Sequence, residues 1–141
     1  MISSQENPPD ISIILEFEDV LVDWDTLVSA RLGPRLSRLN ETERDAVVSQ
    51  LKHPQHSSFI LDMPCSSAVQ GLWSWLQALQ ATVQESTGLR VQVSICLGGG
   101  PGSSWTHPLK QQWVLRHLGP SALVHAVCGR NRYQLCVLCA V

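Results

Sequence analysis

The segment that most constrains the fold of this chain is an apolar run that ends in closely spaced acids. Residues 11–17 read ISIILEF, and the acids are Glu16, Glu18 and Asp19. Such a run predicts a buried strand, on which residues two apart point to the same side. Ligands bind at strand tips in open parallel sheets, where Glu16 and Glu18 have the chemistry to hold a metal, attack a phosphoryl group or exchange protons. The alternative is a strand that ends in a solvated acidic turn.

Composition indicates one globular domain with an uneven charge distribution. The chain has 141 residues, of which 44% are hydrophobic and 16% charged, enough for a real core and unlike a disordered chain. All acids except Glu85 lie between Glu6 and Asp62. The more basic second half has no Lys/Arg run with interleaved aromatic residues, so we expect no nucleic-acid partner.

The cysteines and the hydropathy pattern indicate a cytoplasmic protein. The five cysteines lie in apolar, strand-like contexts, and no secretory signal precedes them, which favours reduced thiols. Cys136 and Cys139 form a CxxC pair that would be half of a zinc site, but no second pair completes it. No apolar run approaches the ~18 residues of a membrane span, so we expect no membrane partner.

The order of predicted elements favours an α/β fold. The predicted strands are 11–17, 91–97, 122–128 and 134–141, and the predicted helices are 24–36, 41–51, 62–85 and 109–118. This order predicts a mostly parallel sheet with helices on both faces. Residues 1–10, which are polar and contain two prolines, are expected to form a loose leader. A single domain would then span 11–141.

Helix punctuation supports several of these boundaries. Asn40 followed by Glu43 predicts a capping box, and Pro108 and Gly119 bracket the helix at 109–118. Gly33-Pro34 interrupts the helix at 24–36, and Ser66 and Ser67 are capping residues in the range 62–85. On the long helix, Trp73 and Trp75 could form a base-stacking platform. Alternatively Trp73 lies in the core and Trp75 at its edge, which is the interpretation we favour.

A glycine-rich loop joins the strand at 91–97 to the helix at 109–118. Gly98, Gly99 and Ser103 offer groups that could cradle a phosphate together with the helix N-terminus. The loop matches neither the P-loop nor the dinucleotide-binding pattern, so a flexible turn is the alternative. Lys110 opens the following helix, where it would either neutralise a phosphate or lie exposed to solvent.

Four segments, in order, resemble the haloacid-dehalogenase-like (HAD-like) phosphohydrolases, and more closely their 5'(3')-deoxyribonucleotidase branch. Residues 14–23 (ILEFEDVLVD) resemble the family's Asp-x-Asp-Gly-Val-Leu-x-Asp motif at the end of a hydrophobic strand. Residues 59–64 (FILDMP) resemble the return from the cap into the core. Residues 93–96 (VSIC) resemble the strand that ends in the family's Thr-Ser. Residues 110–120 (KQQWVLRHLGP) resemble its Lys-x-x-Trp-Val-Glu-x-x-Leu/Phe-Gly-Pro segment.

The resemblance implies a Rossmann-like core with a small helical cap at about residues 26–58. It also implies Mg²⁺-dependent dephosphorylation of a nucleoside monophosphate through a phospho-carboxylate intermediate. The implied roles are nucleophile and metal ligand for Glu16, acid/base and metal ligand for Glu18, phosphate clamp for Lys110, and base contact for Phe59 or another aromatic residue of the cap. Phosphate binding by Gly98, Gly99 and Ser103 rests on the glycine-rich loop and not on the resemblance. Apart from the resemblance, we consider a homodimer or a heterodimer as the assembly, with an active relative as the partner if the chain is non-catalytic.

This chain departs from the family pattern where catalysis would occur. Glu16 and Glu18 replace both aspartates of the first motif, Asp19 replaces the glycine that follows them, and Leu97-Gly98 replaces the Thr-Ser. The extra methylene of glutamate moves a carboxylate by roughly an ångström or more, and in-line attack is sensitive to such misplacement.

The acids that hold magnesium late in the family's sequence have no evident counterpart here. After Asp62 the only acidic side chain is Glu85, and the chain ends where the last third of the family begins. The sequence therefore predicts a degenerate, C-terminally truncated relative with impaired hydrolysis. The alternatives are a non-catalytic nucleotide-binding or regulatory partner of an active nucleotidase, and a truncated product.

Overall fold

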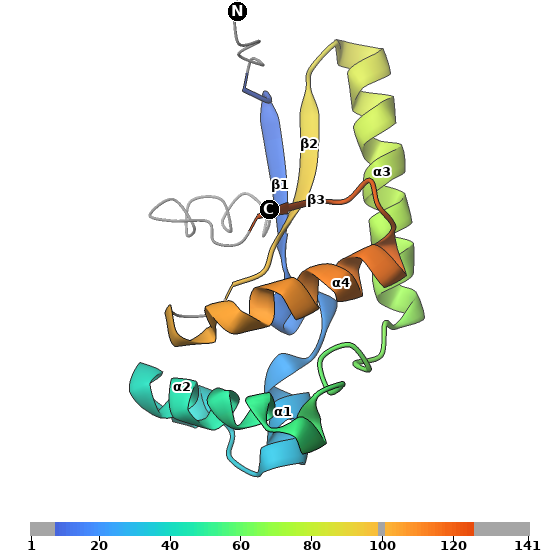
Figure 1. Cartoon of the computed structure of the whole chain (residues 1–141). Helices are drawn as coiled ribbons and strands as arrows, with labels where there is room; N and C mark the ends of the chain where they lie inside the picture. Colours follow the sequence, from blue (N-terminus) through green and yellow to red (C-terminus); the bar gives the residue numbers. More distant parts are fainter. Residues whose placement is uncertain (1–7, 99–100, 126–141) are drawn as a thin grey trace, which may run out of the picture.

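The computed structural model of the chain describes residues 8–98 and 101–125 (Figure 1). In this part of the chain, β1 (Ile11–Glu16), β2 (Val91–Cys96) and β3 (Leu123–His125) form a parallel sheet in the order β1-β2-β3. β1 and β2 pair along their whole length, from Ile11 opposite Val91 to Glu16 opposite Cys96. The predicted α/β class with parallel pairing is thus confirmed at this level. The Rossmann-like architecture remains a prediction.

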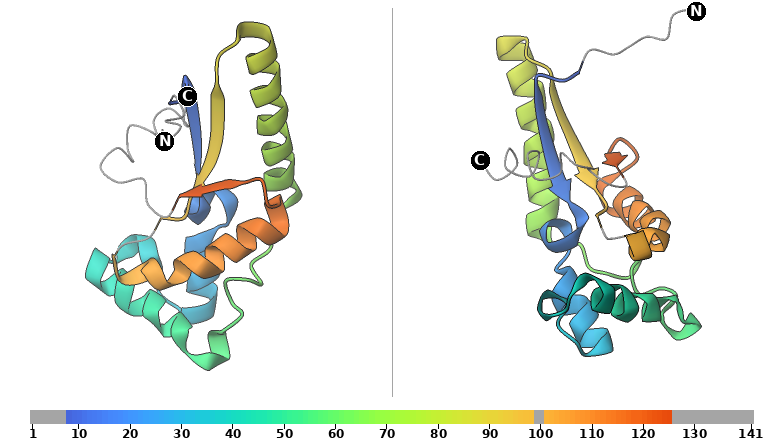
Figure 2. Two further views of the ribbon diagram at one scale, coloured as in Figure 1. Left: turned by 45° about the horizontal axis from the view of Figure 1, so that its top comes forward. Right: turned by 90° about the vertical axis from the view of Figure 1, so that its left-hand side faces the viewer.

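The helices follow the predicted order. They are α1 (Trp24–Leu32), α2 (Glu41–Ser49), α3 (Ser67–Thr87) and α4 (His107–Leu118). Short 3-10 turns at Leu36–Arg38, Gln50–Lys52, Pro54–His56 and Pro101–Thr106 lie between them. Figure 2 shows α3 running alongside β2, while α4 crosses near the carboxyl ends of β1 and β2.

Two helices are shorter than the ranges in which they were predicted, and each ends or begins at a local signal in the sequence. The helix predicted at 24–36 ends at Leu32, because Gly33 has a φ of 104° and leaves the helical conformation. The helix predicted at 62–85 begins at Ser67, after a cap in which the side chain of Ser66 accepts from Val69 N at 3.2 Å. A serine cap fixes this start because its oxygen satisfies an otherwise unpaired amide.

The capping box of α2 is present as predicted. The side chain of Asn40 accepts from Glu43 N at 2.8 Å, and Glu43 Oε1 accepts from Asn40 N at 3.1 Å. The tryptophans of α3 are also divided as predicted, because Trp73 is 6% exposed and Trp75 is 59% exposed. Trp73 therefore belongs to the core, and α3 packs its apolar face toward β2.

The core joins the sheet to the helical segment between β1 and α3. Its most deeply buried side chains come from the turn after β1, from α1, from the segment before α3, from β2 and the residue after it, and from α4. They are Phe17, Leu21, Val28, Ile60, Ile95, Leu97, Trp113 and Val114. These residues place the tips of β1 and β2 directly beside the start of α4, which is where the predicted functional residues lie.

Several sequence predictions concern residues outside the described ranges. These are most of the leader, the end of the strand at 122–128, the strand at 134–141, and the CxxC pair Cys136 and Cys139. Cys65 and Cys96, which the structure does describe, are free thiols. No helix in the described part of the chain is long and apolar enough to cross a membrane.

Candidate functional site

The backbone changes direction immediately after β1. The strand ends at Glu16, and Phe17–Leu21 forms a kinked turn within which Glu18 is extended, with φ −73° and ψ 128°. Glu18 thus lies in a turn beyond the strand, and strand alternation does not govern its direction. The expectation that Glu16 and Glu18 share one strand was therefore wrong, because the turn begins at Phe17.

Asp19 adopts a left-handed backbone with φ 72°, the one positive φ among the described residues other than glycine. This conformation favours glycine, although aspartate and asparagine tolerate it better than most side chains. Burial and then the charge of Glu18 raise the pKa of the Asp19 carboxyl above its usual value. The turn therefore brings a strained backbone and repelling carboxylates together at the tip of β1.

Lys110, from the first turn of α4, reaches into this turn. Its Nζ donates to Glu18 Oε1 at 2.7 Å and to the carbonyl of Leu97 at 3.1 Å. The side chain of Lys110 is 0% exposed, whereas that of Glu18 is 22% exposed. Removing an ammonium from water is costly unless it is paired and hydrogen-bonded, as it is here.

Aromatic rings complete the surroundings of the Lys110 ammonium. Its Nζ lies 4.5 Å from the ring centre of Trp24 and 5.4 Å from that of Phe17. The negative faces of aromatic rings attract a cation at this range, and more strongly where water is excluded. Lys110 is therefore stabilised by a carboxylate, a carbonyl and two rings together.

Trp113 fixes the position of α4 relative to this cluster. Its Nε1 donates to the carbonyl of Met63 at 2.7 Å, and its ring meets the edge of Phe17 at 5.2 Å between centres. Trp113 is completely buried. Because it lies one turn after Lys110 on α4, this anchor holds the lysine in reach of Glu18.

The other predicted site residues lie in different surroundings. Glu16 is half-buried at the end of β1, and Gly98 has a φ of 69° with its carbonyl 2.8 Å from His107 Nε2. Phe59, the predicted base contact, is half-buried below the guanidinium of Arg31, which lies 5.7 Å from its ring centre. Gly99 and the side chain of Ser103 lie outside what the structure describes. Of the predicted site, the structure thus brings together Glu18 and Lys110.

The carboxylates at the tip of β1 do not form a magnesium site by themselves. Within residues 8–98 and 101–125, no three His, Cys, Asp or Glu side chains are close enough to hold a metal. Glu18 already accepts from the Lys110 ammonium, which places a positive charge beside the carboxylate that a cation would need. Magnesium requires a near-octahedral set of oxygens, and these donors do not fit that requirement.

Sequence reasoning missed the groups that enclose Lys110. Phe17 and Trp24 were assigned no role, although each stands beside an acid in the segment EFEDVLVDWD. An aromatic residue next to acids near a strand tip is a signal for a cation site, because rings and carboxylates attract the same charge. The carbonyl of Leu97 could not be found in this way, since every residue carries one.

Comparisons with protein families, with curated proteins and with solved structures found no match to this chain.

Proposed function

We propose that this chain is a degenerate 5'(3')-deoxyribonucleotidase-like protein of the HAD-like type, whose strand-tip site does not sustain phosphate-ester hydrolysis. The observation that carries the proposal is the ion pair between Lys110 and Glu18, with 2.7 Å between Nζ and Oε1 and no exposure of the lysine side chain. The pair occupies the groups that would bind and process a phosphate.

The geometry at the strand tip supports the relationship to this branch. Segments 14–23 and 110–120, which resemble its first and last motifs, meet through a pair 92 positions apart. Asp19, which stands where the motif has glycine, has the left-handed backbone that glycine adopts readily. A turn that requires a left-handed backbone at this position would account both for the glycine of the resembled motif and for the strain at Asp19.

The same geometry argues against hydrolysis. A phosphate clamp must present its ammonium to the ligand, yet Lys110 is completely buried between Glu18, Leu97 and two aromatic rings. A general acid/base must be free to exchange a proton with the substrate, whereas the carboxylate of Glu18 already accepts from Lys110. Glu16 carries one methylene more than the aspartate of the motif, which displaces its carboxylate from the position that in-line attack requires.

Phosphate release from deoxyuridine monophosphate in the presence of magnesium tests the proposal. We expect no release by the full chain above that of Glu16→Gln, in samples shown by circular dichroism to be folded. Turnover that disappears in Glu16→Gln would establish Glu16 as a working nucleophile and would overturn the proposal.

Titration of the same samples with deoxyuridine monophosphate addresses the alternative of a non-catalytic nucleotide-binding protein. The buried Lys110 leads us to expect no saturable binding at the strand tip. Saturable binding without turnover, weakened in Lys110→Met, would show instead that the site opens to take up a nucleotide.

A further inference from the structure

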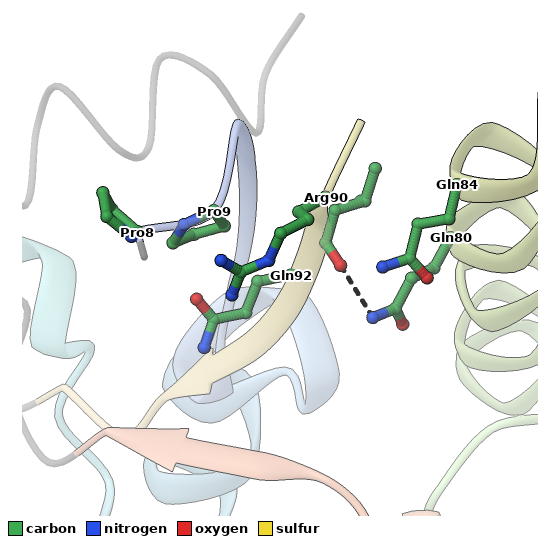
Figure 3. A pocket seen from close by; sticks show the side chains of 7 residues that line it. Pro8, Pro9, Gln80, Gln84, Arg90 and Gln92 are labelled. Atoms are coloured by element: carbon green, nitrogen blue, oxygen red, sulfur yellow. Dashed lines mark hydrogen bonds between the residues drawn. The ribbon is translucent and has the colours of Figure 1, made fainter. Parts of the chain in front are cut away.

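A hollow lies at the opposite end of the sheet from Glu18 and Lys110. It has a volume of 360 Å³ and is formed where the start of β2 passes between α3 and the residues that precede β1 (Figure 3). The residues that line it include Pro8, Pro9, Gln80, Gln84, Arg90 and Gln92. Pockets for small ligands range from roughly 300 to 1,000 Å³, so this hollow suits a ligand at the small end of that range.

Arg90 supplies the positive charge of the hollow. Its backbone N–H donates to Asp10 Oδ2 at 2.7 Å, which ties the start of β1 to β2. Among residues 8–98 and 101–125, no acid makes an ion pair with its guanidinium and no acid lines the hollow. Asp10 is the neighbouring carboxylate, and its oxygen already accepts from the Arg90 backbone rather than from the guanidinium.

Glutamine side chains supply amide groups on two sides of Arg90. Gln80 Nε2 donates to the carbonyl of Val91 at 2.7 Å, which fixes the side chain and leaves its Oε1 as an acceptor. Figure 3 shows Gln80 and Gln84 projecting from α3 toward β2. The side chains of Arg90, which immediately precedes β2, and of Gln92 point away from α3, toward Pro9. The hollow thus combines one guanidinium with several amides that can donate and accept.

From this arrangement we propose that the hollow binds a small carboxylate that also carries an amide group, such as an N-acylated amino acid or the C-terminal residue of a peptide. A guanidinium pairs with a planar carboxylate through parallel N–H···O bonds. The glutamine amides match a peptide-like amide in the same ligand, and the rings of Pro8 and Pro9 offer an apolar wall. The proposal concerns the other end of the sheet and does not depend on the proposed function.

Nuclear magnetic resonance of the full ¹⁵N-labelled chain tests this inference with two probes that differ only in charge. N-acetylglycine carries the carboxylate, and N-acetylglycinamide replaces it with a neutral amide. We expect saturable shifts of the Arg90 Nε–H and of the Gln84 and Gln92 side-chain amides with the acid alone. Equal shifts with both probes, or shifts that do not saturate, would overturn the proposal.

Two arginine variants distinguish the hollow from general attraction of anions. Arg90→Gln should weaken binding of N-acetylglycine by about tenfold or more, because a hydrogen bond to a charged group is lost. Arg38→Gln is the matched control, since Arg38 is an exposed arginine outside the hollow. Unchanged affinity in Arg90→Gln, or an equal loss in both variants, would contradict the assignment.

A tetrapeptide with a free C-terminus, compared with its amidated form, identifies the source of the carboxylate. Tighter binding of the free peptide than of N-acetylglycine indicates a peptide C-terminus. Exclusion of the peptide with retention of N-acetylglycine indicates a free small molecule, and failure of both carboxylates would overturn the proposal.

Discussion

Lys110 Nζ donates a 2.7 Å hydrogen bond to Glu18 Oε1, which joins the first turn of α4 to the turn after β1. The two side chains differ sharply in exposure, at 0% for the lysine and 22% for the glutamate. Because of this difference, loss of Glu18 leaves a buried ammonium, whereas loss of Lys110 leaves a carboxylate that is partly exposed to water.

Glu18→Gln should destabilise the protein more than Lys110→Met. The glutamine variant removes the charge of the carboxylate that pairs with a fully buried ammonium, which we expect to cost about 3 kcal/mol. The methionine variant keeps the volume beside Phe17 and Trp24, and the remaining Glu18 can regain water, so we expect a loss of about 1–2 kcal/mol. Urea unfolding followed by tryptophan fluorescence measures both. The reverse order would show that Lys110 reaches water in solution.

Asp19→Gly should stabilise the protein slightly, by up to about 1 kcal/mol. A left-handed conformation costs a residue with a side chain roughly 1–2 kcal/mol, and the greater freedom of glycine in the unfolded chain offsets part of that gain. Asp19→Ala is the control and should destabilise the protein. Alanine keeps the steric penalty of the left-handed conformation but lacks the polar side chain that helps aspartate to tolerate it. Equal stability of the glycine and alanine variants would show that φ at this position is not the cause.

Asp19→Asn should stabilise the protein only above the usual pKa of aspartate. Burial, and then the charge of Glu18, raises the pKa of Asp19 above its ordinary value of 3.8. The folded state thus holds this proton more tightly than the unfolded state, and the stability from this group is lost as pH rises from 3.8 through the raised pKa. Thermal unfolding at several pH values should show the variant gaining on the native protein across that window. A gain that is the same at pH 3 and pH 7 would exclude an electrostatic cause.

His117→Gln should remove part of the acid sensitivity of the protein near neutral pH. Burial, and then the charge of Arg116, lowers the pKa of His117 below its ordinary 6.5, and its ring lies 4.6 Å from that of Trp113. The folded state favours the neutral ring, so stability present above pH 6.5 is lost as pH falls through the lowered pKa. Unfolding free energies between pH 7.5 and 5 measure this slope.

A second histidine contributes to the same slope and provides the control. Burial, then Arg31 and then His53, lowers the pKa of His56, which lies in the 3-10 turn Pro54–His56. The double variant His56→Gln/His117→Gln should therefore have a flatter pH profile than either single variant. A single variant that leaves the slope of the native protein unchanged would rule out the histidine concerned as its source.

Trp113→Phe should destabilise the protein by about 1–3 kcal/mol. The substitution keeps an aromatic ring near Phe17 but leaves the carbonyl of Met63 without its 2.7 Å hydrogen bond in the core. Trp75→Phe on the exposed side of α3 is the matched control and should change stability little, because Trp75 is 59% exposed. The midpoints of urea unfolding measure the loss of stability in the two variants. Equal losses would show that the smaller ring, and not the missing hydrogen bond, is responsible.

The sequence by itself determined the elements whose signals are local. The capping box of Asn40 and Glu43, the serine cap of α3 and the buried runs of β1 and β2 are read from neighbouring residues, because caps and apolar periodicity act within one or two turns of chain. The division of Trp73 and Trp75 between core and surface followed from the same helical spacing.

Only the tertiary structure decided what the acidic tip of β1 does. The sequence placed Glu16 and Glu18 on one strand and left Lys110 either at a phosphate or in solvent, whereas the structure turns the chain at Phe17 and buries Lys110 against Glu18. The physical reason is that the two residues of this pair are 92 positions apart in the sequence. The ring of Trp24 and the carbonyl of Leu97 contact the ammonium, and Trp113 anchors the helix that carries it. No local sequence pattern encodes this enclosure. The cost of removing the ammonium from water, and the interactions that offset it, arise only when the turn after β1, α1, the end of β2 and α4 meet.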